Sequence, residues 1–229
     1  MINKLKTLLG ALAFLAMTSS VSAGEFGVGI TGAYLNLETE GSEILRDSNE
    51  STSAAASEKV TIPEIFIEYT GDSSVTLGFA YIPGEAELGS KSKAKTDSLT
   101  AEEATAVTNK AAAEFTNHMT FYAEFHDDSG FFLKGGIVRV NVTTLETLGT
   151  GGIYSDVDDV YGYLAGVGFK GDIPLDLAGQ SLFYKLGAEY VNYHGITLTG
   201  AQDSVTNGQT TIDADIDSVA LKLSLGTTF

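Results

Sequence analysis

The sequence predicts an all-β fold, a transmembrane antiparallel up-and-down β-barrel of eight strands. Apolar residues recur at every second position in about eight segments, and the connections between these segments are alternately short and long. Period two indicates strands with one apolar face and one polar or small face. The alternation of connection length is typical of membrane barrels, in which short turns all lie on one side and long loops on the other.

The N-terminus has the pattern of a secretory signal peptide. Two lysines precede an apolar run over 8–17, and small residues end at Ala23. The run is about half the ~20 apolar residues that a spanning helix needs, so a membrane anchor is the weaker alternative. We expect a cleaved signal peptide over 1–23 and one barrel domain over 24–229.

The expected strands share aromatic and branched residues that alternate with glycine, small or charged residues. In chain order they are 26–34, 64–69, 75–81, 115–125, 131–142, 161–170, 182–190 and 219–229. In the fourth strand, Phe115, Met119 and Phe121 are expected on the same apolar face.

The connections fall into two classes. The short ones have tight-turn compositions at 71–74 and 127–130, with a somewhat longer link at 171–180. The long polar ones are 38–59, 84–114, 144–158 and 196–212. Within 99–113, Thr100 and Glu103 fit a capping box before an Ala-rich helix, and an extended hairpin arm is the alternative.

The fifth strand changes parity at Gly135-Gly136. A β-bulge there would bring the apolar residues on both sides onto one face and would place Lys134, Arg139 and Asn141 on the other. Two short strands separated by a kink are the alternative.

The two faces can be assigned from the solvent that each would meet. In lipid the strands must close into a barrel, with the apolar parity outward and the polar, glycine-rich parity inside. A soluble barrel with an apolar interior is disfavoured, because the inner parity carries charges that fit no dry ligand cavity. These charged residues are Glu64, Glu68, Glu124, Lys134, Arg139, Lys170, Lys185, Glu189 and Lys222.

An eight-stranded barrel is narrow enough for side chains to fill it. Because buried charges are costly unless they are matched, the nine residues are interpreted as an interior ion-pair network that plugs the barrel. A gate or narrow ion path is the alternative.

The last segment, 219–229, has apolar residues at every second position and ends in Phe229. It resembles the C-terminal insertion signal of bacterial outer-membrane barrels, and the chain resembles the small eight-stranded family of the OmpA/OmpX and opacity-protein kind. The resemblance implies the bacterial outer membrane of a Gram-negative-type cell and contact with its lipid and lipopolysaccharide. It also implies a monomer whose final strand is read by the barrel-assembly machinery.

The charge distribution bears on other partners. The formal net charge is −17, which excludes non-specific binding to nucleic acid, and most acidic residues fall in the outer loops. Asp213, Asp215 and Asp217 form a row just above the last strand's apolar stretch, where they could bind Ca²⁺ or Mg²⁺. A solvated acidic rim is the alternative. The sequence contains no motif for a cofactor.

We expect a non-enzymatic barrel with a structural or surface-interaction role, whose loop ligand the sequence does not name. The first alternative is a narrow channel for ions or small apolar solutes, as in OmpW-like barrels. The second is a lipid-modifying outer-membrane enzyme, for which His118 is the candidate base and a polar rim histidine the alternative interpretation.

Overall fold

The computed structural model describes residues 24–44, 51–71, 74–97, 105–145, 154–177, 180–199 and 211–229. The expected signal peptide over 1–23 lies outside these residues. In the described part of the chain, no helix has the length and hydropathy needed to cross a membrane. The strands are β1 (Gly24–Ile44), β2 (Ser51–Gly71), β3 (Val75–Tyr81), β4 (Ala86–Asp97), β5 (Thr105–His126), β6 (Phe131–Thr144), β7 (Val157–Leu177), β8 (Gln180–Tyr193), β9 (Ile196–Thr199) and β10 (Thr211–Thr228).

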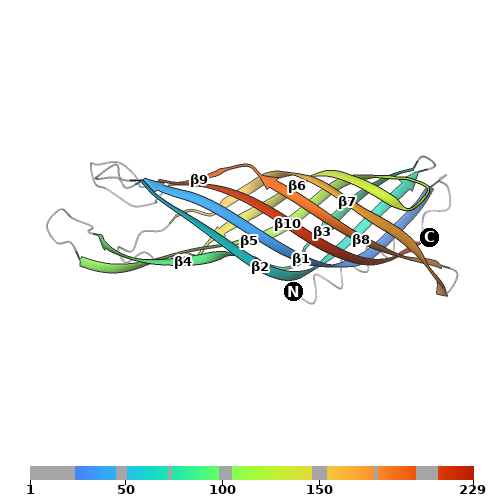
Figure 1. Cartoon of the computed structure of the whole chain (residues 1–229), viewed down its shortest axis with the longest axis horizontal. Coiled ribbons are helices and arrows are strands. Elements are labelled where there is room, and N and C mark those ends of the chain that lie inside the picture. The colour runs from blue at the N-terminus through green and yellow to red at the C-terminus, as the bar shows by residue number, and fades with distance from the viewer. Residues whose placement is uncertain are drawn as a thin grey trace.

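The strands form one antiparallel sheet that closes on itself (Figure 1). The order is β1-β2-β3-β5-β6-β7-β8-β10, and β10 pairs with β1. Since β4 continues β3 along β5, and β9 continues β8 along β10, the ten segments make eight barrel strands. The closing seam ends at Phe229, whose N–H donates to the Phe26 carbonyl at 3.0 Å. The predicted eight-stranded barrel is confirmed.

The strands continue far into the stretches expected to be long loops. The β1–β2 ladder runs to the pair Ile44 and Ser51, and the β4–β5 ladder to the pair Asp97 and Thr105. The hairpin arm is therefore correct, and the helix is wrong over 105–113, where pairing with β4 satisfies the backbone. Thr100 and Glu103 lie outside the described residues.

The predicted bulge at Gly135-Gly136 is wrong. Strand β6 passes through both glycines in unbroken register with β5 and with β7. The parity change reflects a change of environment along a regular strand: Ile137 points outward, whereas Val138, Val140 and Val142 point inward and are fully buried.

The register instead shifts at two other places near the same level. One lies in β5 between Thr116 and Met119, where Asn117 has a φ of 53°. The other lies in β7 between Val157 and Val160, opposite Val142 and Val140 of β6, and Asp159 there has a φ of 60°. The first shift turns Phe115 inward, where it is 3% exposed, so its predicted outward position is wrong.

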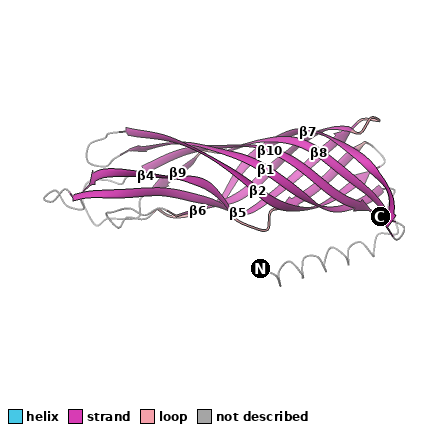
Figure 2. Cartoon of the chain, turned by 60° about the horizontal axis from the view of Figure 1, so that its bottom comes forward, coloured by secondary structure: helices cyan, strands magenta, loops and turns pink. Residues whose placement is uncertain are grey.

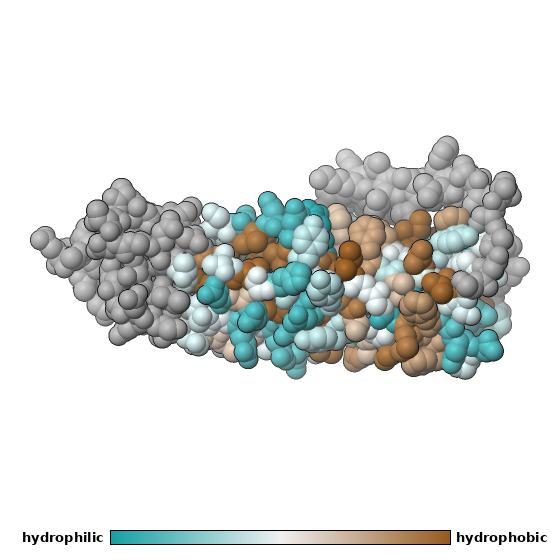
Figure 3. Space-filling view, turned by 90° about the horizontal axis from the view of Figure 1, so that it is seen from above, coloured by the Kyte–Doolittle hydropathy of each residue, from teal (hydrophilic) through white to brown (hydrophobic). Residues whose placement is uncertain are grey.

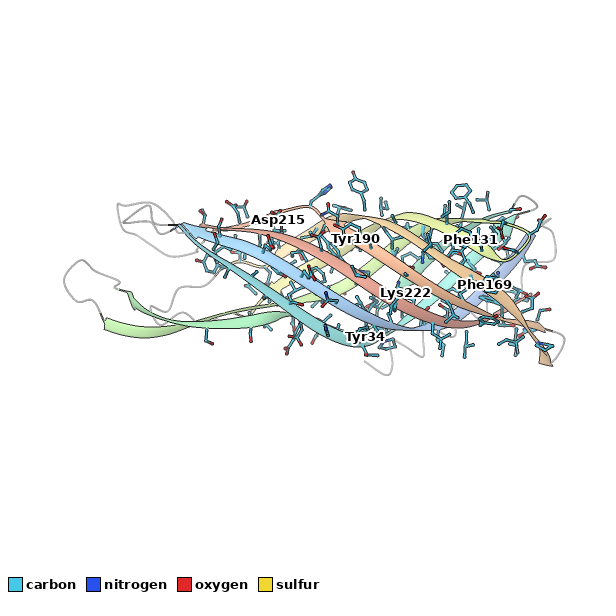
Figure 4. All side chains as sticks on the ribbon, viewed as in Figure 1. Tyr34, Phe131, Phe169, Tyr190, Asp215 and Lys222 are labelled. Carbon is cyan, nitrogen blue, oxygen red and sulfur yellow. The ribbon has the colours of Figure 1, made fainter. Side chains whose placement is uncertain are left out.

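Along most strands the apolar face switches sides. Toward the short-turn end the outward residues are apolar, and they lie between two aromatic levels, marked by Phe131 and Phe169 at one and Tyr34 and Tyr190 at the other (Figure 4). Beyond the tyrosines the outward residues become polar, as with Asp215 (Figure 4). In Figure 3 polar side chains are frequent on the left of the described surface, with apolar patches between them, and apolar side chains predominate right of centre. Aromatic girdles of this kind flank the apolar band of outer-membrane barrels.

The barrel wall has a seam between β2 and β4. The β2–β3 ladder ends at the pair Ile65 and Tyr81, and among the described residues no backbone pairing joins the rest of β2 to β4. Figures 1 and 2 show the β4–β5 arm diverging from β1 and β2 beyond this point. The remaining stretch of β2, residues 51–64, is therefore a free strand edge.

The seam predicts a hydrogen-exchange pattern. In β2 over 51–64, the amides that point away from β1 should exchange quickly, while the alternate amides bonded to β1 should be protected. Strand β1, which is paired on both sides along most of its length, is the internal control. Uniform protection along β2, measured by NMR on the protein in lipid nanodiscs, would contradict the seam.

Candidate functional site: the two zones of the barrel interior

The interior toward the short turns contains an alternating chain of charges, here called the charged zone. Its eight members follow one another in space as Glu64, Lys222, Glu189, Lys134, Glu124, Lys185, Glu68 and Lys170. Four carboxylates thus face four ammonium groups. Together the eight residues come from six different strands. Eight of the nine residues predicted for the interior network are brought together.

The contacts along this chain are close. Lys222 Nζ lies 2.8 Å from both Glu64 Oε2 and Glu189 Oε2, and Lys134 Nζ lies 2.6 Å from Glu189 Oε1. Lys185 Nζ lies 2.6 Å from Glu124 Oε2 and also donates to Glu68. Each ammonium in this inner part bridges two carboxylates, which satisfies the condition for tolerating buried charge.

Aromatic rings complete the charged zone. Phe66, Phe132 and Phe183 surround Lys185 with ring centroids 5.6 to 5.8 Å from its Nζ, and Lys134 Nζ lies 3.8 Å from the centroid of Tyr122. Rings at these distances attract a desolvated cation.

Each of these rings lies against a glycine on the neighbouring strand. A Cβ on that glycine would approach the ring Cζ to between 2.1 and 2.4 Å, so the position leaves no room for a side chain. The glycine–aromatic pairs are Gly29 with Phe66, Gly78 with Tyr122, Gly168 with Phe132, and Gly226 with Phe183.

The charged zone leaves little open space. A cavity of about 20 Å³ lies among its side chains, bounded by Thr31, Phe66, Tyr122 and Ser224 as well as by six of the eight charged residues. This volume holds about one water molecule. Its size argues against an open ion path through this level of the barrel.

The interior beyond the tyrosine level has the opposite character and is here called the apolar zone. Its buried members are Ala33, Leu35, Leu37, Ala86, Leu88, Phe115, Val138, Val140, Val142, Val160, Leu164, Val191, Tyr193, Ile196, Ile216 and Ala220. The expectation of a polar, glycine-rich interior is thus correct for the charged zone and wrong here. At its inner end this zone still lies behind outward apolar residues such as Ile137, Tyr163 and Val219. Farther out the wall carries polar side chains outside, and its apolar residues face inward as in a soluble barrel.

His118 lies between the two zones. Its Nε2 is 3.2 Å from the Tyr193 hydroxyl in the apolar zone, while the charges of Lys222 and Glu189 act on its ring from the charged zone. The side chain is 8% exposed, so it is an interior histidine and not a polar rim residue.

Arg139 is the predicted network residue that the structure places elsewhere. Because β6 has no bulge at its glycines, Arg139 points outward, where it pairs with Asp159. Both side chains of this pair are more than a third exposed.

The row of Asp213, Asp215 and Asp217 lies on the outer face of β10. Glu38 is paired with Asp217 and Glu40 with Asp215 across the β1–β10 ladder. Asp217 Oδ1 accepts hydrogen bonds from the side chains of Tyr190 and Asn192, both at 2.7 Å. Among the described residues, no three acidic, histidine or cysteine side chains converge as a metal ion requires.

The acidic rim also includes Glu114 on β5. Partial burial raises its pKa, and the nearby charges of Glu85, Glu87 and Asp156 raise it further. The rim therefore concentrates negative charge where the barrel meets the exterior.

Two solved structures share this architecture. The outer membrane protein OprG from Pseudomonas aeruginosa has a TM-score of 0.58 and 13% identity, covering 91% of this chain and 97% of that chain. AlkL, determined in lipid bilayers, has a TM-score of 0.51 and 11% identity, covering 93% of each chain. No protein-family model matches the chain, and no curated protein matches its sequence. The fold is therefore that of an outer-membrane β-barrel.

Several interior residues were not singled out from the sequence. Phe132 and Phe183 share the inner parity with Lys134 and Lys185, and Leu35 and Leu37 share it with Thr31. The only sequence signal for their inward position was that they alternate in step with the inward polar residues. This signal was not sufficient, because the interior of a membrane barrel is expected to be polar and these residues are apolar.

The charged zone predicts a specific mutational pattern. Lys222→Met should lower the free energy of unfolding by about 3–5 kcal/mol, because Glu64 and Glu189 lose a buried ammonium. Adding Glu64→Met should recover most of this loss, since the shortened chain is again balanced. Urea titration in lipid vesicles measures both changes.

Arg139→Met is the matched control. It removes an exposed ion pair and should cost less than about 1 kcal/mol. A double variant no more stable than Lys222→Met would contradict the alternating chain.

Proposed function

We propose that this chain is an outer-membrane barrel that admits small apolar solutes from the exterior into the apolar zone. The observation that carries the proposal is the set of apolar side chains that point into that zone, among which Leu37, Val138, Val140 and Val142 are fully buried. Apolar surfaces of this kind favour apolar solutes over water.

The seam between β2 and β4 supports an entrance from the side. Val60 and Ile62 of β2, and Ala86 and Leu88 of β4, belong to the apolar zone or pack against it. Because no backbone pairing joins the two strands among the described residues, they can separate without breaking a ladder. Separation would open the apolar zone at the side of the barrel.

The charged zone supports apolar solutes over ions. Its cavity of about 20 Å³ and its paired carboxylates and ammonium groups provide no free charge for a passing ion. We therefore favour the apolar-solute form of the channel alternative over ion conduction and over a purely structural barrel.

The proposal also covers how the barrel is assembled and what surrounds it in the membrane. We infer that the barrel-assembly machinery reads the strand ending in Phe229, which closes the barrel against Phe26. We further infer that lipid and lipopolysaccharide surround the apolar band, and that the barrel acts as a monomer without enzymatic activity.

The proposal is tested by uptake of ethylbenzene into cells whose intact lipopolysaccharide layer slows apolar compounds. Production of the protein should raise the initial rate several-fold. Val140→Thr combined with Val142→Thr should reduce the gain by about fivefold per added hydroxyl, because the lining becomes polar without changing shape. The heat-dependent gel mobility of folded barrels confirms assembly.

Thr143→Val provides the matched control, because it makes the reverse exchange outside the apolar zone on the same strand. It should leave uptake unchanged. If the wild-type protein does not raise uptake, the apolar-solute proposal is wrong and a structural role is favoured.

A further inference from the structure

Two polar side chains at the base of the apolar zone are buried without hydrogen-bond partners. His118 Nδ1 and Thr120 Oγ1 make no hydrogen bond within the described part of the chain. His118 is 8% exposed and Thr120 is 1% exposed. A buried polar atom left unpaired costs about 1–3 kcal/mol, so two on one strand require an explanation.

The two residues lie where the apolar and charged zones meet. Thr120 is paired with Val138, a fully buried member of the apolar zone, and therefore shares its inward face. His118 reaches Tyr193, whose ring centroid lies 4.8 Å from that of Phe115 in the same zone, with the ring planes tilted by 49°. A molecule that filled the apolar zone would meet both free polar atoms at its inner end.

We propose that His118 and Thr120 form a polar floor that binds the single hydrogen-bonding head group of an otherwise apolar solute. This inference rests on the proposed function and narrows its substrate class to small alcohols, phenols or ketones with an apolar body.

The chemistry of the floor fits an uncharged head group. A threonine hydroxyl donates and accepts, and the free imidazole nitrogen does either according to tautomer. Lys134 and Lys222 are already held by two carboxylates each, so neither offers a free charge to a carboxylate or phosphate head. A hydroxyl can satisfy both floor atoms at once, whereas a hydrocarbon leaves both unpaired.

The test compares benzyl alcohol with ethylbenzene, which have the same number of heavy atoms and differ in one hydroxyl. Binding to the full barrel in micelles is followed through the ring ¹⁵N resonances of its three histidines. After correction for micelle partitioning, wild type should bind benzyl alcohol about fivefold or more tightly. Benzyl alcohol should move the His118 Nδ1 resonance, and ethylbenzene should leave it in place.

Two variants isolate the floor. Thr120→Val removes the hydroxyl at constant shape, and His118→Phe removes the ring nitrogens. Each should lower the preference for benzyl alcohol by about fivefold while ethylbenzene binding persists. Thr76→Val is the control, because Thr76 is buried on the inner face but bonds to Thr70 away from the floor.

The outcomes separate this inference from the function on which it rests. If both compounds bind wild type equally, or if the preference survives in both variants, the polar floor is wrong and water alone satisfies the two atoms. If neither compound binds, the proposed uptake of apolar solutes fails together with the floor. The isosteric Thr120→Val keeps the test decisive should His118→Phe not assemble.

Discussion

The structure depends on one constraint: the outside of a single continuous barrel wall passes from lipid to water along its length. Toward the short turns the wall meets hydrocarbon, and its outward side chains are therefore apolar. Beyond the tyrosine level the wall meets water, and its outward side chains become polar. A strand has only two faces, so the interior must change in the opposite sense: charged beside the lipid and apolar beyond it.

The charged zone reconciles a polar interior with a narrow barrel. Eight charged side chains alternate in sign, so most of the charges contact more than one opposite partner without a channel of water. Interior aromatic rings fill the remaining space, and their cross-strand glycines provide room for them. This filling separates the apolar zone from the short-turn end of the barrel, so the proposed solutes would have to enter from the exterior or through the seam.

The sequence was sufficient for the architecture and for eight of the nine interior charges, because alternation is a direct consequence of strand geometry. The predicted inward position of Arg139 was wrong because the apolar residues were assumed to face outward along the whole strand. The valines after Gly135-Gly136 appeared to require a bulge, whereas the strand is regular and its surroundings change. The predicted outward position of Phe115 was wrong for the opposite reason. A bulge at Asn117 reverses the face on which Phe115 lies, and an asparagine at that position does not by itself predict a bulge. The seam between β2 and β4 was also not predictable, because it depends on which strands fail to pair.

The central claim is that the outside of the wall passes from lipid to water within β6. Because the chain contains no cysteine, a single spin label can be attached at Leu133, Ile137, Asn141 or Thr143, all on the outward face. Electron paramagnetic resonance then compares collisions with oxygen, which concentrates in lipid, and with a water-soluble nickel complex. Labels at Leu133 and Ile137 should favour oxygen, and labels at Asn141 and Thr143 should favour nickel. An oxygen preference that continued to Thr143 would contradict the switch of environment and the origin proposed for the apolar zone.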